Sequence, residues 1–103
     1  MSLDPAAVAD RVAVSSVVAA LAFAQDDRDW ERLRNLFTPE VHLDLSRVFG
    51  EPAVDIPAAQ LAGQARAVIG GFESTHHATS NAEVTVDGDE ARCRAHVVAT
   101  RRR

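Results

Sequence analysis

The stretch of residues 12–24 constrains the fold most, because it is apolar except for two serines. Asp4 and Pro5 stand upstream of it, and these residue types favour the N-cap and the first position of a helix. We therefore predict a helix over about residues 6–25. Apolar residues lie on most sides of this helix, and such a helix is buried on most sides. The remaining chain should form a concave surface around it.

The same stretch has some features of a secretory signal peptide, which carries positive charge before a short apolar segment. Here Asp4 and Asp10 leave no net positive side-chain charge before the apolar residues. The apolar stretch is also shorter than the roughly 20 residues that cross a bilayer. We therefore expect a cytoplasmic chain that does not act at a membrane.

The composition limits the function classes. A chain of 103 residues is one small domain, here taken as 1–103. Its 15 acidic and 11 basic residues give a net charge of -4, which argues against a nucleic-acid partner. Cys93 is the only cysteine, so an internal disulfide and a multi-thiolate metal site are excluded. We expect this thiol to be buried and inert.

Shorter elements follow the first helix. Apolar spacing predicts a short helix that begins near Trp30 and ends before Pro39, because proline disfavours helix in the preceding residue. Alternation then predicts a strand over residues 41–45. We expect a loop over 46–56 and a third helix over 57–69, capped by a residue just before it, Asp55 or Ile56.

In the last third of the chain, apolar and polar residues alternate as they do in β-strands. Asp87 and Gly88 form a strong signal for a hairpin turn between two such strands. A loop of even length puts Val84 and Val86 on one face with Cys93, and by the same parity puts His77 on the other face. A bulge near residues 80–81 would reverse the position of His77, and the sequence leaves both arrangements open.

The order of helix, helix, strand, helix and long antiparallel strands indicates an α+β fold, with helices packed on one face of a curved sheet. The sheet is thin, and no closing turn follows the last strand.

Four segments carry a family resemblance, and they read LAFAQDDRDWERL (21–33), LFTPE (36–40), THHATSN (75–81) and VTVDGDEA (84–91). Their order and spacing resemble SnoaL-like proteins of the nuclear transport factor two-like superfamily. The resemblance runs from about Asp10 onward and implies a cone-shaped α+β fold. Relatives continue for two or three further strands, so the resemblance implies that the C-terminal strands are missing here.

Within this superfamily, the motifs are most similar to those of scytalone dehydratase-like enzymes. The resemblance matches their catalytic aspartate to Asp26 and their first catalytic histidine to His77. Their second pocket histidine has no counterpart here, since His96 lies several residues too early, and the chain has no tyrosine. The candidate catalytic residues are Asp26 and His77, and the candidate substrate-binding residues are Phe23, Trp30, Asn81 and His96.

The residues themselves allow plainer interpretations. Asp26 is one of three acids in four residues, so it belongs either to a solvated turn or to a pocket. His76 and His77 point to opposite faces of a strand, so only one of them can share a pocket with Asp26, and they do not readily chelate one metal ion. Asn81 either orients a substrate or occupies a bulge.

Two function classes fit these observations. The first is a cofactor-independent lyase, isomerase or cyclase in which His77 is a general base for a small apolar organic substrate and Asp26 orients it. The second is a non-catalytic ligand-binding or dimerisation module of the same fold. The enzyme hypothesis predicts that Asp26 and His77 meet in an enclosed cavity. Because the sheet is thin, we also expect a homodimer.

Overall fold

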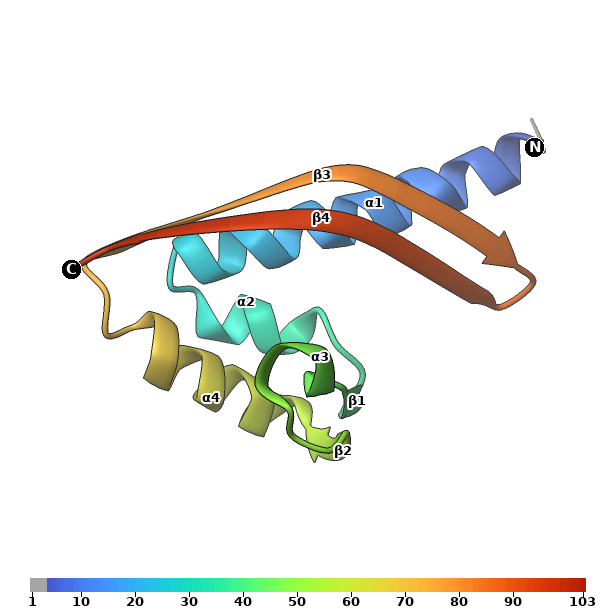
Figure 1. The fold of residues 1–103 in the computed structure, drawn as a ribbon. Helices are drawn as coiled ribbons and strands as arrows, with labels where there is room; N and C mark the ends of the chain where they lie inside the picture. Colours follow the sequence, from blue (N-terminus) through green and yellow to red (C-terminus); the bar gives the residue numbers. More distant parts are fainter. Residues whose placement is uncertain (1–3) are drawn as a thin grey trace.

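Four helices and two antiparallel ribbons make up residues 4–103, the part of the chain that the computed structural model describes (Figure 1). The β3–β4 hairpin lies along α1, α2 packs on α4, and the small β1–β2 ribbon lies at the far end of α4. This arrangement confirms the predicted α+β class. The elements are α1 (Pro5–Asp26), α2 (Trp30–Asn35), β1 (Glu40–Leu43), α3 (Ser46–Phe49), β2 (Val54–Pro57), α4 (Ala58–Ile69), β3 (Ser74–Asp87) and β4 (Glu90–Arg102).

Helix α1 begins as predicted, because the Asp4 carboxylate accepts a hydrogen bond from the Ala7 backbone N–H. Its burial differs from the prediction. Val12 is 60% exposed, and the buried residues of the helix are Ala22 and Ala24, near its C-terminal end. The prediction of a helix buried on most sides is wrong because β3 covers one side of α1 and α2 contacts only its end.

By length and composition alone, α1 could also cross a membrane, since its mean hydropathy reaches 1.7. Core helices of soluble proteins and N-terminal signal sequences meet the same criterion. The expected cytoplasmic location therefore stays a prediction.

The core lies where the end of α1 meets α2 and α4. Ala24, Leu33 and Ala62 are its buried centre, and Leu33 is 1% exposed. Helix α2 is held in place by Asp29, whose carboxylate accepts a hydrogen bond from the Arg32 N–H at its first turn. Partly buried apolar side chains surround this centre: Leu21, Trp30, Leu36, Phe37 and Ala65.

The segment expected as a loop over residues 46–56 is more ordered than predicted, since it contains α3 and most of β2. Strand β2 pairs with β1 and places Asp55 opposite His42. Asp55 therefore does not cap α4, and no side chain does: Pro57 stands at the N-cap position.

The β3–β4 hairpin has a two-residue loop at Gly88-Asp89, because Asp87 pairs with Glu90. Gly88 adopts a φ of 59°, which glycine allows without strain. Farther along β3, the register shifts between Ser80 and Glu83, and Asn81 has a φ of 59°. This is a β-bulge, in which two residues of β3 oppose one residue of β4.

The bulge decides which face His77 occupies. Without the bulge, His77 would lie on the opposite face from Val84 and Val86. With the bulge, all three side chains point to the same face of β3, and all three are partly buried. That face packs on α1. Cys93 pairs with Val84 on the same face but is exposed, so the prediction of a buried thiol is wrong. Helix α1 lies along β3 and leaves this part of β4 uncovered.

Candidate functional site

Asp26 is the last residue of α1, and the turn after it is tied to the start of β3. Arg28 has a φ of 58° and donates hydrogen bonds to the backbone carbonyls of Phe72 (2.5 Å) and Asp26 (3.3 Å). These bonds join the α1–α2 turn to the segment that enters β3. Asp26 is thereby placed against the inner face of the hairpin.

The Asp26 carboxylate meets the His77 ring on that face. The distance between Asp26 Oδ1 and His77 Nδ1 is 2.6 Å. The same carboxylate accepts hydrogen bonds from the His77 backbone N–H (2.8 Å, to Oδ2) and from the Thr75 hydroxyl (3.0 Å, to Oδ1). The side chains of His77 and Asp26 are only 15% and 16% exposed.

The surroundings of Asp26 set its charge state. Burial raises the pKa of this carboxyl, but the hydrogen bonds from the His77 N–H, the His77 ring and the Thr75 hydroxyl lower it by more. The net effect is a pKa below the ordinary value of 3.8. Asp26 is therefore a carboxylate at neutral pH.

An ionised Asp26 determines which ring nitrogen of a neutral His77 carries the proton. Oδ1 accepts from Nδ1–H, so Nε2 is left with a free lone pair. A histidine held in this way has the geometry that a general base needs, because a carboxylate at Nδ1 can stabilise the imidazolium that forms when the ring takes a proton. The pair can therefore remove a proton from a ligand on the sheet face.

The β4 side of the face beside the pair is apolar and open, whereas Thr75 and Thr79 flank His77 on β3. Ala99 stands directly opposite His77 on β4, and Val97, two residues earlier, is 57% exposed. Phe23 lies one helical turn before Asp26 and is 61% exposed. Phe23 thus borders the site without being buried. The enclosed cavity that the enzyme hypothesis predicts is not formed by residues 4–103 alone.

Known proteins of similar sequence and structure share this fold. A family model described as a SnoaL-like domain matches residues 6–103. The chain belongs to the SnoaL-like domain family. In general, this family is of the kind that includes small-molecule isomerases and cyclases. Its fold is the nuclear transport factor two-like fold.

A crystal structure of the Kfla4162 protein from Kribbella flavida has a similar fold, with a TM-score of 0.86 and 30% sequence identity. The match covers 92% of this SnoaL-like chain and 65% of the Kribbella chain, so this chain spans less than two thirds of that protein. No curated protein matches the chain.

Two other candidate residues of this SnoaL-like domain lie away from the pair. His96 pairs with Ser80, which places it on the face of the hairpin that points away from α1. His96 and His77 therefore do not share a pocket here. Asn81 occupies the bulge and lines a small outer hollow with Glu83 and His96.

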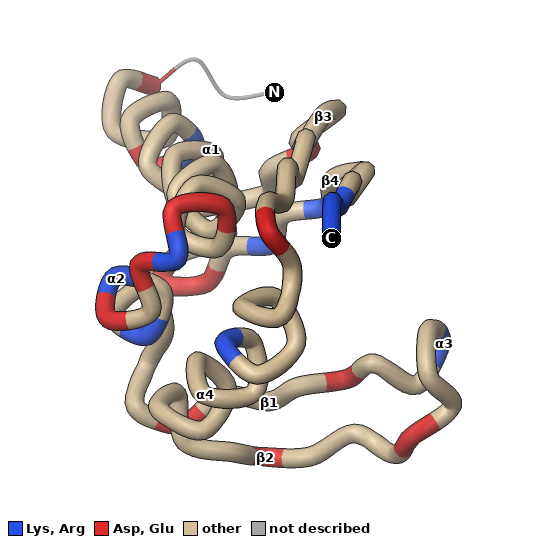
Figure 2. Tube along the Cα trace, turned by 90° about the vertical axis from the view of Figure 1, so that its left-hand side faces the viewer, with Lys and Arg blue, Asp and Glu red and all other residues tan. Residues whose placement is uncertain are grey.

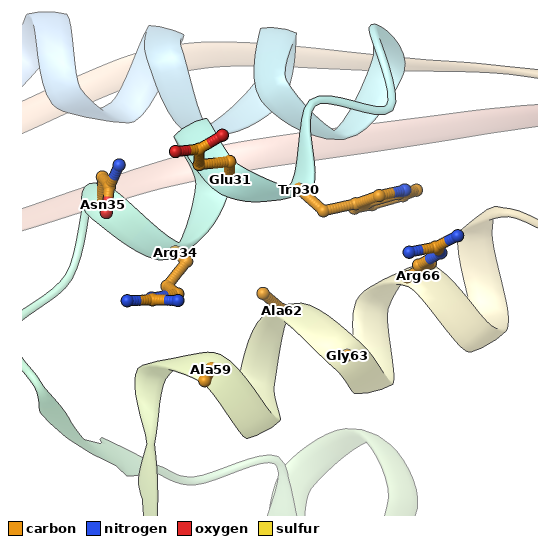
Figure 3. A pocket seen from close by; sticks show the side chains of 8 residues that line it. All are labelled: Trp30, Glu31, Arg34, Asn35, Ala59, Ala62, Gly63 and Arg66. Carbon is orange, nitrogen blue, oxygen red and sulfur yellow. The ribbon is translucent and has the colours of Figure 1, made fainter.

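Trp30 also lies apart from Asp26 and His77. Its ring packs beside the core and lines an open groove of about 440 Å³ between α2 and α4 (Figure 3). Arg34 and Arg66 lie on the same groove, and the small residues Ala62 and Gly63 form its α4 side. Trp30 is thus a core-flanking residue, separate from the histidine.

Sequence reasoning missed two residues that build the site. Thr75 shares the face of His77 because it stands two positions earlier, so strand parity could have identified it. Arg28 gave no such signal, since its role depends on the turn geometry. Within residues 4–103, no group of three or more His, Cys, Asp and Glu side chains is arranged to hold a metal ion.

Proposed function

We propose that this domain is an acid–base enzyme of the lyase, isomerase or cyclase type, acting on a small, largely apolar molecule without a cofactor. The observation that carries the proposal is the 2.6 Å contact between Asp26 and His77 on the α1 face of the hairpin. A partly buried carboxylate, a histidine with one free nitrogen and the apolar residues Ala99 and Val97 beside it suit proton abstraction from carbon or oxygen.

In the proposed reaction, His77 Nε2 takes a proton from the ligand, and the ring becomes an imidazolium. Asp26 stabilises the new charge through Nδ1–H. The imidazolium then returns the proton to another atom of the same molecule in an isomerisation, or to a leaving hydroxyl in a dehydration. A positioned base of this kind contributes on the order of 10²–10⁴-fold in rate.

The open face supports the second candidate function, a ligand-binding or dimerisation module. Val97, on the sheet face that holds His77, and Phe23, near the end of α1, are each more than half exposed. Both candidates fit a homodimer in which a second copy covers one sheet face. Size-exclusion chromatography with light scattering should then give twice the chain mass, and a monomer at micromolar concentration would contradict the dimer.

A proton-exchange experiment tests the enzyme proposal. Small cyclic ketones are incubated with the protein in D₂O, and the loss of α-proton signals is followed by NMR. We expect exchange above the buffer rate for the unmodified protein, and a fall to the buffer rate for His77→Ala. The matched control is His76→Ala, because His76 is the adjacent residue but lies exposed on the other face.

Exchange that is lost equally in both variants would contradict the role of His77. Exchange that persists in His77→Ala would do the same. No exchange with any ketone, together with saturable binding of the same compounds, would favour the ligand-binding module.

A further inference from the structure

Arg101 lies on the same face of the hairpin as His77. Thr75 pairs with Arg101 and His77 pairs with Ala99, and directly opposed residues in an antiparallel pair share a face. Arg101 is therefore the diagonal neighbour of His77. Such residues are about 7–8 Å apart along the sheet, which is within reach of a long side chain.

On β4, no bulky side chain separates these two residues. The residue directly opposite His77 is Ala99, which is exposed and has only a methyl group. The next residue on that face toward the bulge is Val97, which is also exposed. A ligand lying on Ala99 would touch the His77 ring on one side and come within reach of the long Arg101 side chain on the other.

Two of the three arginines at this end of the hairpin have no acidic partner among residues 4–103. Arg101 and Arg103 lie 5.3 Å and 5.5 Å from the centroid of the same Phe72 ring. Within residues 4–103, neither guanidinium has a carboxylate at ion-pair distance. Their neighbour Arg102 differs, since it approaches Glu73 at 3.8 Å. Figure 2 shows these basic residues gathered at the end of β4.

The contact with Phe72 also orients Arg101. A guanidinium over an aromatic face keeps its N–H groups in the plane of the fork, where they can bind a carboxylate through two parallel hydrogen bonds. The Phe72 segment is itself fixed by the hydrogen bond from Arg28. Arg101 is thus held by the same structure that positions Asp26.

We propose that the site takes a ligand with a carboxylate at one end, bound by Arg101, and an apolar body that lies on Ala99 and Val97 next to His77. This inference rests on the proposed function for the location of the site and adds the chemical class of the ligand. The Asp26 carboxylate does not repel such an anion strongly, because its charge is shared among three hydrogen-bond donors. Arg101 is accordingly a specificity residue that touches the ligand.

The test is a binding measurement that does not depend on turnover. The probes are 4-oxocyclohexanecarboxylate and its methyl ester, which differ only in charge at one end. Binding is followed by NMR from the ring signals of His77. We expect the carboxylate to bind at least about ten-fold more tightly than the ester, as fits one charge-assisted contact.

Arg101→Gln should remove this preference, whereas Arg101→Lys should keep part of it, because it retains the charge and loses the fork. The matched control is Arg102→Gln, which changes the next residue on the opposite face and should keep the full preference. Thermal unfolding of each variant checks that the fold is intact.

Equal binding of both probes, or no binding of either at millimolar concentration, would overturn the carboxylate proposal. Equal loss in Arg101→Gln and Arg102→Gln would do so as well. A carboxylate preference without proton exchange would leave this inference standing and count against the enzyme proposal. Proton exchange without a preference for the carboxylate probe would support the enzyme proposal and overturn this inference.

Discussion

The molecule contains two histidine–aspartate pairs with nearly the same contact distance. Asp26 Oδ1 lies 2.6 Å from His77 Nδ1, and Asp55 Oδ1 lies 2.7 Å from His42 Nδ1. Their exposure differs widely. The His77 and Asp26 side chains are 15% and 16% exposed, whereas those of His42 and Asp55 are 69% and 62% exposed.

The two pairs are also built differently. His42 and Asp55 are cross-strand neighbours within one small ribbon, so local pairing is enough to bring them together. Asp26 and His77 come from a helix end and a strand, and the carboxylate takes two further hydrogen bonds there. A short contact alone therefore does not make a candidate site. Partial burial, further donors and a free ring nitrogen on a ligand-accessible face distinguish the Asp26–His77 pair.

The largest expected effect is on the proton-exchange rate. Asp26→Asn keeps the shape of the side chain but removes its charge, and an amide N–H can donate to Nδ1 and leave the proton on Nε2. The base would then be in the wrong tautomer, and we expect the rate to fall on the order of 10²–10⁴-fold. Asp55→Asn is the control and should keep the rate. A similar fall in both variants would show that the structural difference between the two pairs does not determine the proton-exchange rate.

The next effect is on stability. Asp26→Ala leaves the His77 N–H, the His77 ring and the Thr75 hydroxyl without their acceptor. Unsatisfied buried groups cost about 1–3 kcal/mol each, and water can reach part of this site, so we expect a loss of about 2–4 kcal/mol in the free energy of unfolding. Urea unfolding measures it. The control is Asp27→Ala, one residue along and exposed, and a loss of the same size there would contradict the prediction.

The same carboxylate predicts a dependence of stability on pH. Its pKa is below 3.8 in the folded protein, so its contribution is present at pH values above 3.8 and is lost as the pH falls through the folded pKa. Asp44 contributes in the same direction, because its pKa is lowered by hydrogen bonds from Ser46. Urea unfolding between pH 2 and 6 should therefore show a weaker acid dependence for Asp26→Asn than for the unmodified protein. Identical profiles would contradict the assignment.

A smaller effect is expected from Thr75→Val. The substitution removes one donor to Asp26 and keeps the branched shape that favours a strand. One lost hydrogen bond costs about 1 kcal/mol, and His77 still supplies two donors. Thr79→Val is the matched control, since Thr79 stands on the same face two residues beyond His77. An equal loss in both variants would assign the effect to the strand and not to Asp26.

Local sequence signals predicted much of this structure. The Asp4-Pro5 start of α1 and the hairpin turn signalled by Asp87-Gly88 depend on a few neighbouring residues, and the structure has both, the turn at Gly88-Asp89. The Asp26–His77 contact joins residues 51 positions apart. The family resemblance led to it, because no local pattern could. The catalytic role of the two residues stays a prediction.

The remaining features depend on how the chain packs. The bulge between Ser80 and Glu83 decides the face of His77, yet the sequence allowed both parities, because a bulge requires only that a residue such as Asn81 tolerate a positive φ. Exposure was also misjudged at Val12 and Cys93. Apolar periodicity shows which side chains can be buried, but a neighbouring element must be present to bury them.

The smallest expected effect is the coupling energy between His42 and Asp55, the exposed pair. Its measurement compares the two pairs directly. A double-mutant cycle of His42→Ala and Asp55→Ala isolates the energy of that contact from the effects of each substitution alone. Exposed ion pairs contribute little because water and salt screen them and two side chains lose freedom, so we expect a coupling below about 0.5 kcal/mol. The same cycle at Asp26 and His77 should exceed about 1 kcal/mol, because its screening is weaker and the partners are partly buried. Equal coupling energies would mean that contact distance, and not the environment of the pair, sets its strength.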